Sequence, residues 1–158
     1  MPRLNNDDAF PILTLDTVAD GVLSVTHHLA GSYGAVLLYR GSWCPYCNAQ
    51  LAAFARSKDK LDELGLKVVA VSVDSRADAA ALVEKHGLNF PVGYGVDADK
   101  IAVSTDAYVN DSPRYLQSTG FVLDPNGKVI TAVYSSGAIG RLVAEDVIGF
   151  VRYVKSKA

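Results

Sequence analysis

The two cysteines of this sequence, Cys44 and Cys47, are the residues whose type and spacing point most directly to chemistry. A separation of three residues puts two side chains on one face of a helix, about 5–6 Å apart at Cβ. Disulfide-bonded cysteines usually have Cα atoms roughly 4.4–6.8 Å apart, so a disulfide between these two needs little rearrangement. The pair therefore indicates a redox-active dithiol.

Other uses of a cysteine pair have less support in this chain. Two cysteines are too few for a disulfide-stapled scaffold. A closed zinc site needs four nitrogen or sulfur ligands, and His27, His28 and His86 do not form a second ligand pair at metal-binding spacing. Neither a metal nor a cofactor is therefore expected. Two ordinary buried thiols remain the plain alternative.

The residues around the pair predict that it opens a helix. Pro45 suits the first helical turn, because its missing N–H would have no partner there. A sulfur at a helix start meets unpaired N–H groups and the positive end of the dipole, which lower a thiol pKa from about 8.5 to roughly 3.5–7.5. Arg40 adds positive potential from four residues upstream. We expect Cys44 to be the exposed attacking thiolate, and Cys47 the deeper, resolving thiol.

This chemistry fits more than one activity. With a peroxide, Cys44 attacks the O–O bond and becomes a sulfenic acid, and Cys47 condenses with it to a disulfide. With a protein disulfide, Cys44 forms a mixed disulfide that Cys47 releases. A redox sensor or binding module that cycles its disulfide without turnover is a third interpretation. The motif alone does not choose among them.

The elements around the motif follow an alternating order. Residues 35–39 form a continuous apolar run, which is typical of a strand covered on both faces. Residues 45–64 have helical periodicity with a break near Ser57, and residues 66–73 predict a second buried strand. A capping pattern at Ser75 opens a helix that ends at Gly87. Strand, helix, strand and helix in this order predict right-handed crossovers onto a mainly parallel sheet.

The rest of the chain completes the architecture. Pro125-Asn-Gly127 predicts a tight turn between two strands. The other expected elements are strands at 12–15 and 22–25, a helix at 98–107, hairpin strands at 121–124 and 128–134, and a last helix from Arg141 to about Val154. The whole predicts one domain, 1–158, an α/β thioredoxin-like three-layer sandwich with a mixed central sheet and a short N-terminal strand extension.

Composition excludes several classes of protein. Of 158 residues 49% are hydrophobic and 20% charged, which predicts a packed globule rather than a disordered chain. The net charge of −2 argues against binding to nucleic acid. No apolar run approaches the roughly 20 residues that span a bilayer, and the first residues lack a signal-peptide pattern. We expect a cytoplasmic protein that contacts no membrane.

Four segments resemble the peroxiredoxin-like members of the thioredoxin superfamily, in the alkyl hydroperoxide reductase/thiol-specific antioxidant group. They are residues 37–47, with Tyr-Arg-Gly-Ser-Trp-Cys-Pro-Tyr-Cys, and residues 69–75, 87–92 and 121–128. The resemblance implies a thiol-dependent peroxidase that uses Cys44 and Cys47 on hydrogen peroxide or organic hydroperoxides. It also implies an external thioredoxin-, glutaredoxin- or glutathione-like reductant and a monomer or homodimer. Arg141 ends a Gly-Ala-Ile-Gly-Arg segment that also matches the group, without an assigned role.

The resemblance also suggests supporting residues, with two departures. Typical relatives carry Thr or Ser three residues before the attacking cysteine, whereas this chain has Gly41 there and Ser42 one position later. Thioredoxins carry a cis-proline facing the motif, where we expect Thr119, and this difference favours the peroxidase. Arg114 is the nearby candidate for the peroxide-binding arginine. Trp43 is expected to form a lid beside the thiolate rather than to pack in the core.

Overall fold

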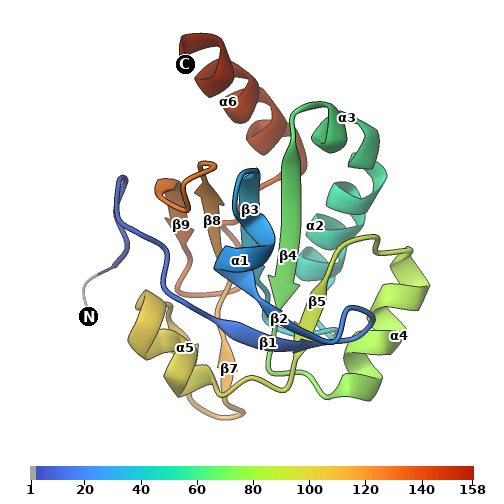
Figure 1. Ribbon diagram of the computed structural model, residues 1–158. Helices are drawn as coiled ribbons and strands as arrows, with labels where there is room; N and C mark the ends of the chain where they lie inside the picture. The colour runs from blue at the N-terminus through green and yellow to red at the C-terminus, as the bar shows by residue number, and fades with distance from the viewer. Residues whose placement is uncertain (1–2) are drawn as a thin grey trace.

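A mixed seven-stranded sheet forms the centre of the computed structural model, which describes residues 3–158 (Figure 1). Its order is β2-β1-β5-β4-β3-β8-β9. The strands are β1 (Thr14–Thr17), β2 (Val22–Ser24), β3 (Tyr33–Leu38), β4 (Leu66–Val71), β5 (Val92–Tyr94), β8 (Thr119–Leu123) and β9 (Val129–Tyr134). Strands β3, β4 and β5 are parallel, and the outer pairs are antiparallel. The predicted mixed sheet, its N-terminal strands and its hairpin are confirmed.

Helices cover both faces of this sheet and make three layers (Figure 1). The helices are α1 (Val25–Leu29), α2 (Pro45–Arg56), α3 (Lys58–Glu63), α4 (Arg76–His86), α5 (Ala98–Thr105) and α6 (Ala144–Lys157). Helices α2, α4 and α6 pack on one face, and α1 and α5 on the other. A small separate pair, β6 (Val109–Asn110) and β7 (Tyr115–Leu116), was not expected from the sequence. The three-layer thioredoxin-like fold is confirmed.

Strand β3 leads directly to the cysteine motif and is buried on both faces. Ala35 and Leu37 belong to the core under α2, α4 and α6. Val36 and Leu38 belong to the core under α1 and α5. This double burial explains the uninterrupted apolar run, and it fixes the point at which the chain leaves the sheet.

Local sequence signals set most of the helix ends. The helix after the motif breaks at Ser57, as expected, and restarts at Lys58. The Ser75 hydroxyl accepts a hydrogen bond from the Asp78 amide at 3.2 Å, and Gly87 ends α4 in a left-handed conformation at φ +60°. The helix following the motif and α4 thus begin and end where the capping rules place them.

The last helix begins later than the sequence suggests. Helix α6 starts at Ala144 and not at Arg141, so the predicted start is wrong by three residues. Gly140 turns the chain at φ +89°, and Val143 is extended at the helix N-cap. Arg141 therefore lies in the loop between β9 and α6. The apolar periodicity of α6 runs back into this loop, which explains the early prediction.

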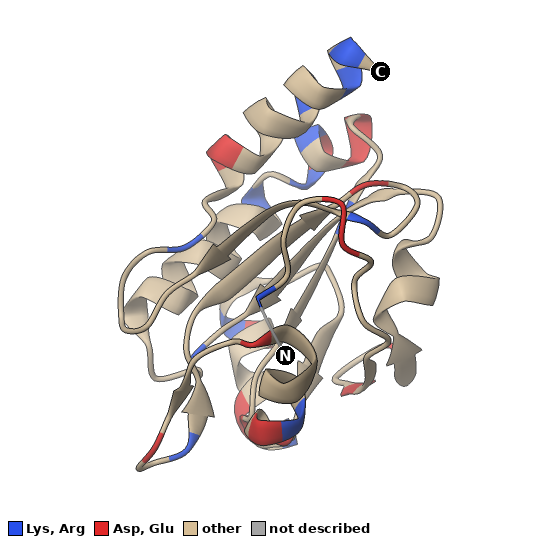
Figure 2. Ribbon diagram, turned by 90° about the vertical axis from the view of Figure 1, so that its left-hand side faces the viewer, with Lys and Arg blue, Asp and Glu red and all other residues tan. Residues whose placement is uncertain are grey.

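Acidic and basic residues alternate along the ribbon in Figure 2, with both signs present in most parts of the chain that it draws in colour. Within residues 3–158, no helix is long and apolar enough to cross a bilayer.

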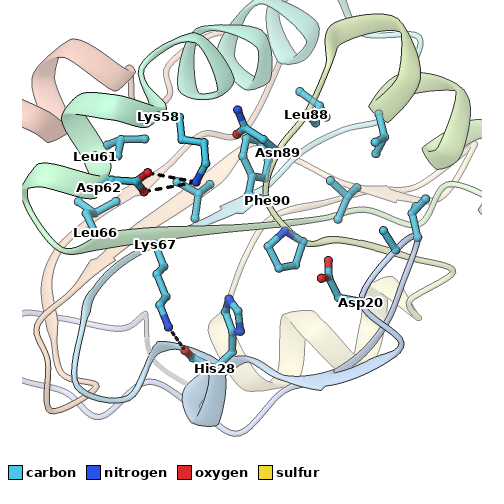
Figure 3. A pocket seen from close by; sticks show the side chains of 16 residues that line it. Asp20, His28, Lys58, Leu61, Asp62, Leu66, Lys67, Leu88, Asn89 and Phe90 are labelled. Atoms are coloured by element: carbon cyan, nitrogen blue, oxygen red, sulfur yellow. Dashed lines mark hydrogen bonds and ion pairs between the residues drawn. The ribbon is translucent and has the colours of Figure 1, made fainter.

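A cavity of about 450 Å³ lies where β4 and β5 begin (Figure 3). Leu66 and Val92 are among its lining residues, and Lys58 and Asp62 form an ion pair of 3.3 Å at its rim. The cysteine motif instead follows the end of β3, which is parallel to β4. The cavity therefore belongs to the opposite end of the sheet from the cysteines.

Candidate active site

Cys44 is the N-cap residue of α2, and its sulfur does the capping. The Cys47 amide donates to Cys44 Sγ at 3.3 Å, and Pro45 occupies the first helical turn. The Cys44 backbone is extended, as an N-cap requires. The sulfur thus accepts a hydrogen bond from one of the N–H groups that a helix start leaves without a partner. This is the arrangement that the sequence predicts for a stabilised thiolate.

A fixed guanidinium faces the same sulfur. Arg40 Nη1 lies 3.7 Å from Cys44 Sγ. Two residues from the β7 region hold this side chain: Arg40 Nε donates to Gln117 Oε1 at 3.0 Å, and Arg40 Nη2 donates to the Tyr115 hydroxyl at 2.9 Å. Because these two hydrogen bonds hold the guanidinium group, its positive charge is directed at Cys44. The expected electrostatic contribution of Arg40 therefore has a geometry that supports it.

Trp43 lies at the surface beside this guanidinium. The residue is 54% exposed, so Trp43 does not pack in the core. Its ring meets Tyr115 edge-on at 4.9 Å between centroids, and the Arg40 guanidinium carbon lies 4.9 Å from the indole centroid. The indole thus lies at the surface against Arg40 and Tyr115, and its role as a lid beside the thiolate stays a prediction.

Gly41 leaves room for that indole. A Cβ atom at position 41 would overlap Trp43 Nε1 and its neighbouring carbons. We expect Gly41→Ala to displace the indole, raise its solvent exposure, and shift the emission of Trp43, the sole tryptophan of the chain, to the red. Steady-state fluorescence with acrylamide quenching measures this change. Gly137→Ala is the matched control, since a Cβ there meets nothing within 4 Å. Unchanged emission in Gly41→Ala would contradict the observed packing.

A buried carboxylate anchors the loop before the motif. Asp74, which follows β4, accepts a hydrogen bond from the Ser42 amide at 2.8 Å. The Asn48 side chain donates to the Ser42 carbonyl at 3.0 Å. Burial is the main cause that raises the pKa of Asp74, against the hydrogen bonds from Ser42 and Ser72. Ser42 therefore contributes through its backbone, which ties the loop to β4 and α2. Because Asp74 follows a strand parallel to β3, its position in the sequence could have predicted that it lies beside the loop that follows β3.

Both sulfurs are covered in this structure. The exposed fraction is 0% for Cys44 and for Cys47, and both side chains belong to the core beneath α2. The expectation that Cys44 is the more exposed of the two is therefore wrong. The reason is that the motif packs into this core, with the Arg40 guanidinium against Cys44.

The two thiols differ in acidity although both are buried. Burial is the largest influence on Cys44 and disfavours its thiolate. Hydrogen bonds from the Cys47 thiol and amide and from Arg40, together with the charge of Arg141, outweigh burial and lower the pKa of Cys44. For Cys47, burial and then the hydrogen bond to Cys44 raise the pKa. The pair therefore holds its first negative charge on Cys44.

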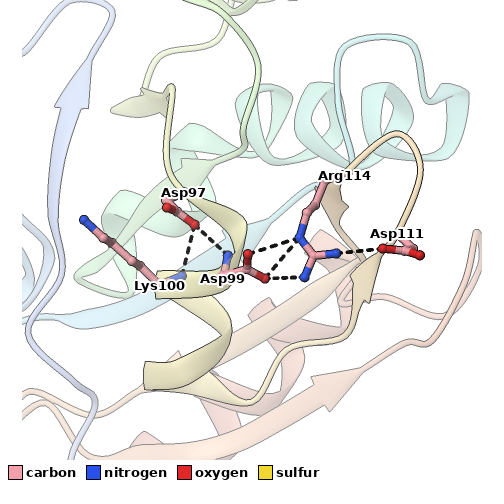
Figure 4. A network of polar contacts seen from close by, with 5 residues as sticks. All are labelled: Asp97, Asp99, Lys100, Asp111 and Arg114. Atoms are coloured by element: carbon pink, nitrogen blue, oxygen red, sulfur yellow. Dashed lines mark hydrogen bonds and ion pairs between the residues drawn. The ribbon is translucent and has the colours of Figure 1, made fainter.

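Two sequence-predicted supporting residues, Arg114 and Thr119, bond to groups other than the two sulfurs. The Arg114 guanidinium is exposed and binds Asp99 and Asp111, with Nε 3.1 Å from both Asp99 oxygens (Figure 4). The expected position of Arg114 beside the motif is thus wrong, because nearby carboxylates hold it at the surface. Thr119 is buried at the start of β8, and its hydroxyl donates to the Gln117 carbonyl at 3.1 Å. Gln117 is the residue of this segment that reaches the site.

Sequence reasoning missed Tyr115, Gln117 and the contact of Arg141 with Cys47. Arg141 Nη1 lies 3.2 Å from Cys47 Sγ. Within residues 3–158, no group of three or more His, Cys, Asp or Glu side chains is placed to hold a metal ion. The described site brings two sulfurs together with two guanidinium groups.

Comparison with known proteins places this site in a family. A family model described as AhpC/TSA family matches residues 7–132. The chain belongs to the AhpC/TSA family. The match confirms the resemblance inferred from the motif, and with it an oxidoreductase of the thiol-dependent peroxidase class.

Proteins similar to this one align with 77% to 99% of the chain. A peroxiredoxin of Treponema denticola is 28% identical over 160 residues, which cover 99% of this chain and 74% of the relative. The thiol-disulfide oxidoreductase ResA of Bacillus anthracis is 26% identical over 122 residues, which cover 77% of this chain and 63% of ResA. The crystal structure of a mutant peroxiredoxin 6 from Arenicola marina superimposes with a TM-score of 0.84 at 17% identity, covering 96% of this chain and 74% of that one. The structural match supports the fold.

Proposed function

We propose that the protein reduces hydrogen peroxide or organic hydroperoxides through a dithiol–disulfide cycle between Cys44 and Cys47. The observation that supports this most directly is the setting of Cys44 Sγ. It accepts a hydrogen bond from the Cys47 amide at 3.3 Å and faces the Arg40 guanidinium at 3.7 Å. A low-pKa sulfur with a second thiol one helical turn away has the two groups that the cycle needs.

The proposed cycle has three steps: oxidation of Cys44, formation of the disulfide, and its reduction. The Cys44 thiolate attacks one peroxide oxygen, the O–O bond breaks, and the other oxygen takes up a proton and leaves as water or an alcohol. Cys44 becomes a sulfenic acid. The Cys47 sulfur then attacks the Cys44 sulfur, the S–O bond breaks, and water leaves as the disulfide forms. An external thiol reductant, thioredoxin-, glutaredoxin- or glutathione-like, returns both cysteines to thiols by exchange.

The guanidinium of Arg40 has a second use in this proposal. Its charge stabilises the thiolate before the reaction, and the same donors can hydrogen-bond the peroxide oxygens as negative charge develops on the leaving oxygen. Because Cys44 is covered, a peroxide reaches it after a local movement, and the exposed Trp43 beside Arg40 is the side chain best placed to move. We also propose a reducing compartment such as the cytoplasm, and a monomer or homodimer.

The similarity to ResA supports one alternative, a protein-disulfide oxidoreductase that uses the same two sulfurs. Stopped-flow mixing of the reduced protein with hydrogen peroxide and organic hydroperoxides separates the two functions. We expect rapid loss of both thiols and only slow reduction of insulin disulfides. Slow oxidation by every peroxide together with rapid insulin reduction would favour the oxidoreductase. Sluggish behaviour in both assays would favour a redox sensor.

A further inference from the structure

Arg141 is a charged residue at the site, and the proposed cycle assigns it no step. It lies in the loop between β9 and α6, and its Nη1 is 3.2 Å from Cys47 Sγ. A separation of 94 residues between the two rules out a local consequence of chain geometry. Arg40 faces Cys44 in the same way, so each sulfur has its own guanidinium.

The loop that carries Arg141 is fixed on both sides of it. Gln50 on α2 donates to the Leu142 carbonyl at 2.7 Å. The Leu142 side chain packs over Gly120 of β8, where a Cβ would lie 2.6 Å from it. On the other side, the Ser135 hydroxyl donates to the Ile139 carbonyl. The guanidinium therefore reaches Cys47 from a held backbone, which lowers the entropy cost of keeping it there.

The location of the negative charge on the two cysteines decides at which step the contact between Arg141 and Cys47 has its largest effect. In the reduced pair the negative charge lies on Cys44, and Cys47 keeps its proton because burial and its hydrogen bond to Cys44 raise its pKa. Conversion of Cys44 to a sulfenic acid removes that negative charge. The hydrogen bond to a Cys44 thiolate then no longer raises the pKa of Cys47. The Arg141 guanidinium and the Arg40 amide, which lies 3.4 Å from Cys47 Sγ, still lower that pKa and so favour the Cys47 thiolate.

We propose that Arg141 is a catalytic residue of the resolving step, in which it stabilises the Cys47 thiolate that attacks the Cys44 sulfenic acid. This inference rests on the proposed function. The Cys47 thiol loses its proton, its sulfur bonds to Cys44 Sγ, the S–O bond breaks, and the departing hydroxide takes up a proton to become water. In the reverse sense, when an external thiolate attacks Cys44 Sγ in the disulfide, Arg141 stabilises Cys47 as the leaving thiolate.

Kinetics of an Arg141→Gln variant test the proposal. Peroxide oxidation followed by Trp43 fluorescence should give a first phase for sulfenic acid formation and a second phase for disulfide formation. The charge of Arg141 is the smallest of the influences that lower the pKa of Cys44, so we expect the first phase to slow much less than the second. The second should slow about 10- to 100-fold, the loss expected for a hydrogen bond to a charged group. Trapping with dimedone and mass spectrometry should show accumulated sulfenic acid. Arg141→Lys, which keeps the charge, should recover part of the rate.

A control and a contrary outcome are available. Arg152→Gln makes the same charge change at an exposed position of α6 and should leave both phases as in the wild type. Arg141 lines an open groove of about 460 Å³, so its replacement opens no sealed void and should not unfold the protein. A second phase of wild-type rate in Arg141→Gln would overturn the inference, as would an equal slowing of both phases.

A measurement without peroxide separates this inference from the proposed function. In a Cys44→Ser background, the thiolate absorbance of Cys47 is titrated with and without Arg141→Gln. The inflection should move to higher pH when Arg141 is replaced, and an unmoved inflection would overturn the inference. If the wild-type protein proves inert to peroxides, the proposed function fails, but this titration still decides whether Arg141 stabilises the Cys47 thiolate.

Discussion

Replacing Cys44 by serine should abolish peroxide consumption, whereas replacing Cys47 should leave a single turnover. A serine hydroxyl is not ionised at neutral pH and does not attack a peroxide. In Cys47→Ser, Cys44 is still oxidised, but no thiol resolves the sulfenic acid. We expect consumption of one equivalent of peroxide and a protein whose mass increases by one oxygen atom. Peroxide assays on the reduced proteins, followed by intact-mass spectrometry, measure both results.

The Cys44→Ser variant should also fold, which makes its loss of activity interpretable. Serine is a favoured N-cap residue, and its hydroxyl can accept the hydrogen bond that Cys47 N–H now gives to Cys44 Sγ. Thermal unfolding of the wild type and both variants provides the control. Full peroxidase activity in Cys44→Ser would show that the assigned roles are wrong.

The second large effect is expected at Arg40. In Arg40→Met the sulfur of Cys44 loses the guanidinium 3.7 Å away, so the pKa of Cys44 should rise. The thiolate is the reactive form, and a raised pKa lowers its fraction at neutral pH. We expect the rate constant for Cys44 oxidation near neutrality to fall about 10- to 100-fold, since hydrogen bonds to charged groups are worth roughly 1.5–3 kcal/mol. The rate should recover in part as the pH is raised.

The pH profile decides what Arg40 contributes. If it acts on the thiolate, the inflection of the rate against pH moves upward in Arg40→Met. A fall of equal size at every pH would instead assign Arg40 to peroxide binding alone. Gln117→Leu, which removes one of the partners that hold the guanidinium, should give a smaller loss of the same kind. Wild-type kinetics in Arg40→Met would contradict the assignment of Arg40 to the stabilisation of the Cys44 thiolate.

Much of the fold follows from local patterns in the sequence. The double burial of β3 follows from a continuous apolar run, and the turn between β8 and β9 follows from Pro125-Asn-Gly127. The cap formed by Cys44 follows from its place between a strand and Pro45. These features depend on neighbours in sequence, where spacing and turn chemistry carry the information.

The partners of the sulfurs could not be found in this way. Tyr115 and Gln117 approach Arg40 from 75 and 77 residues away, and Arg141 approaches Cys47 from 94. Arg114 has the residue type expected of a peroxide-binding group, but Asp99 and Asp111 hold it at the surface. Residue type and nearness in sequence predict the sulfurs, while tertiary packing decides which arginines face them.

These long separations have a consequence for protein synthesis. Cys44 and Cys47 emerge from the ribosome well before residues 115, 117 and 141, and loops of this length close only when the sheet and its helices assemble. In a nascent chain Arg40 therefore lacks the two partners that hold it, and Cys47 lacks Arg141, until the sheet and its helices have assembled.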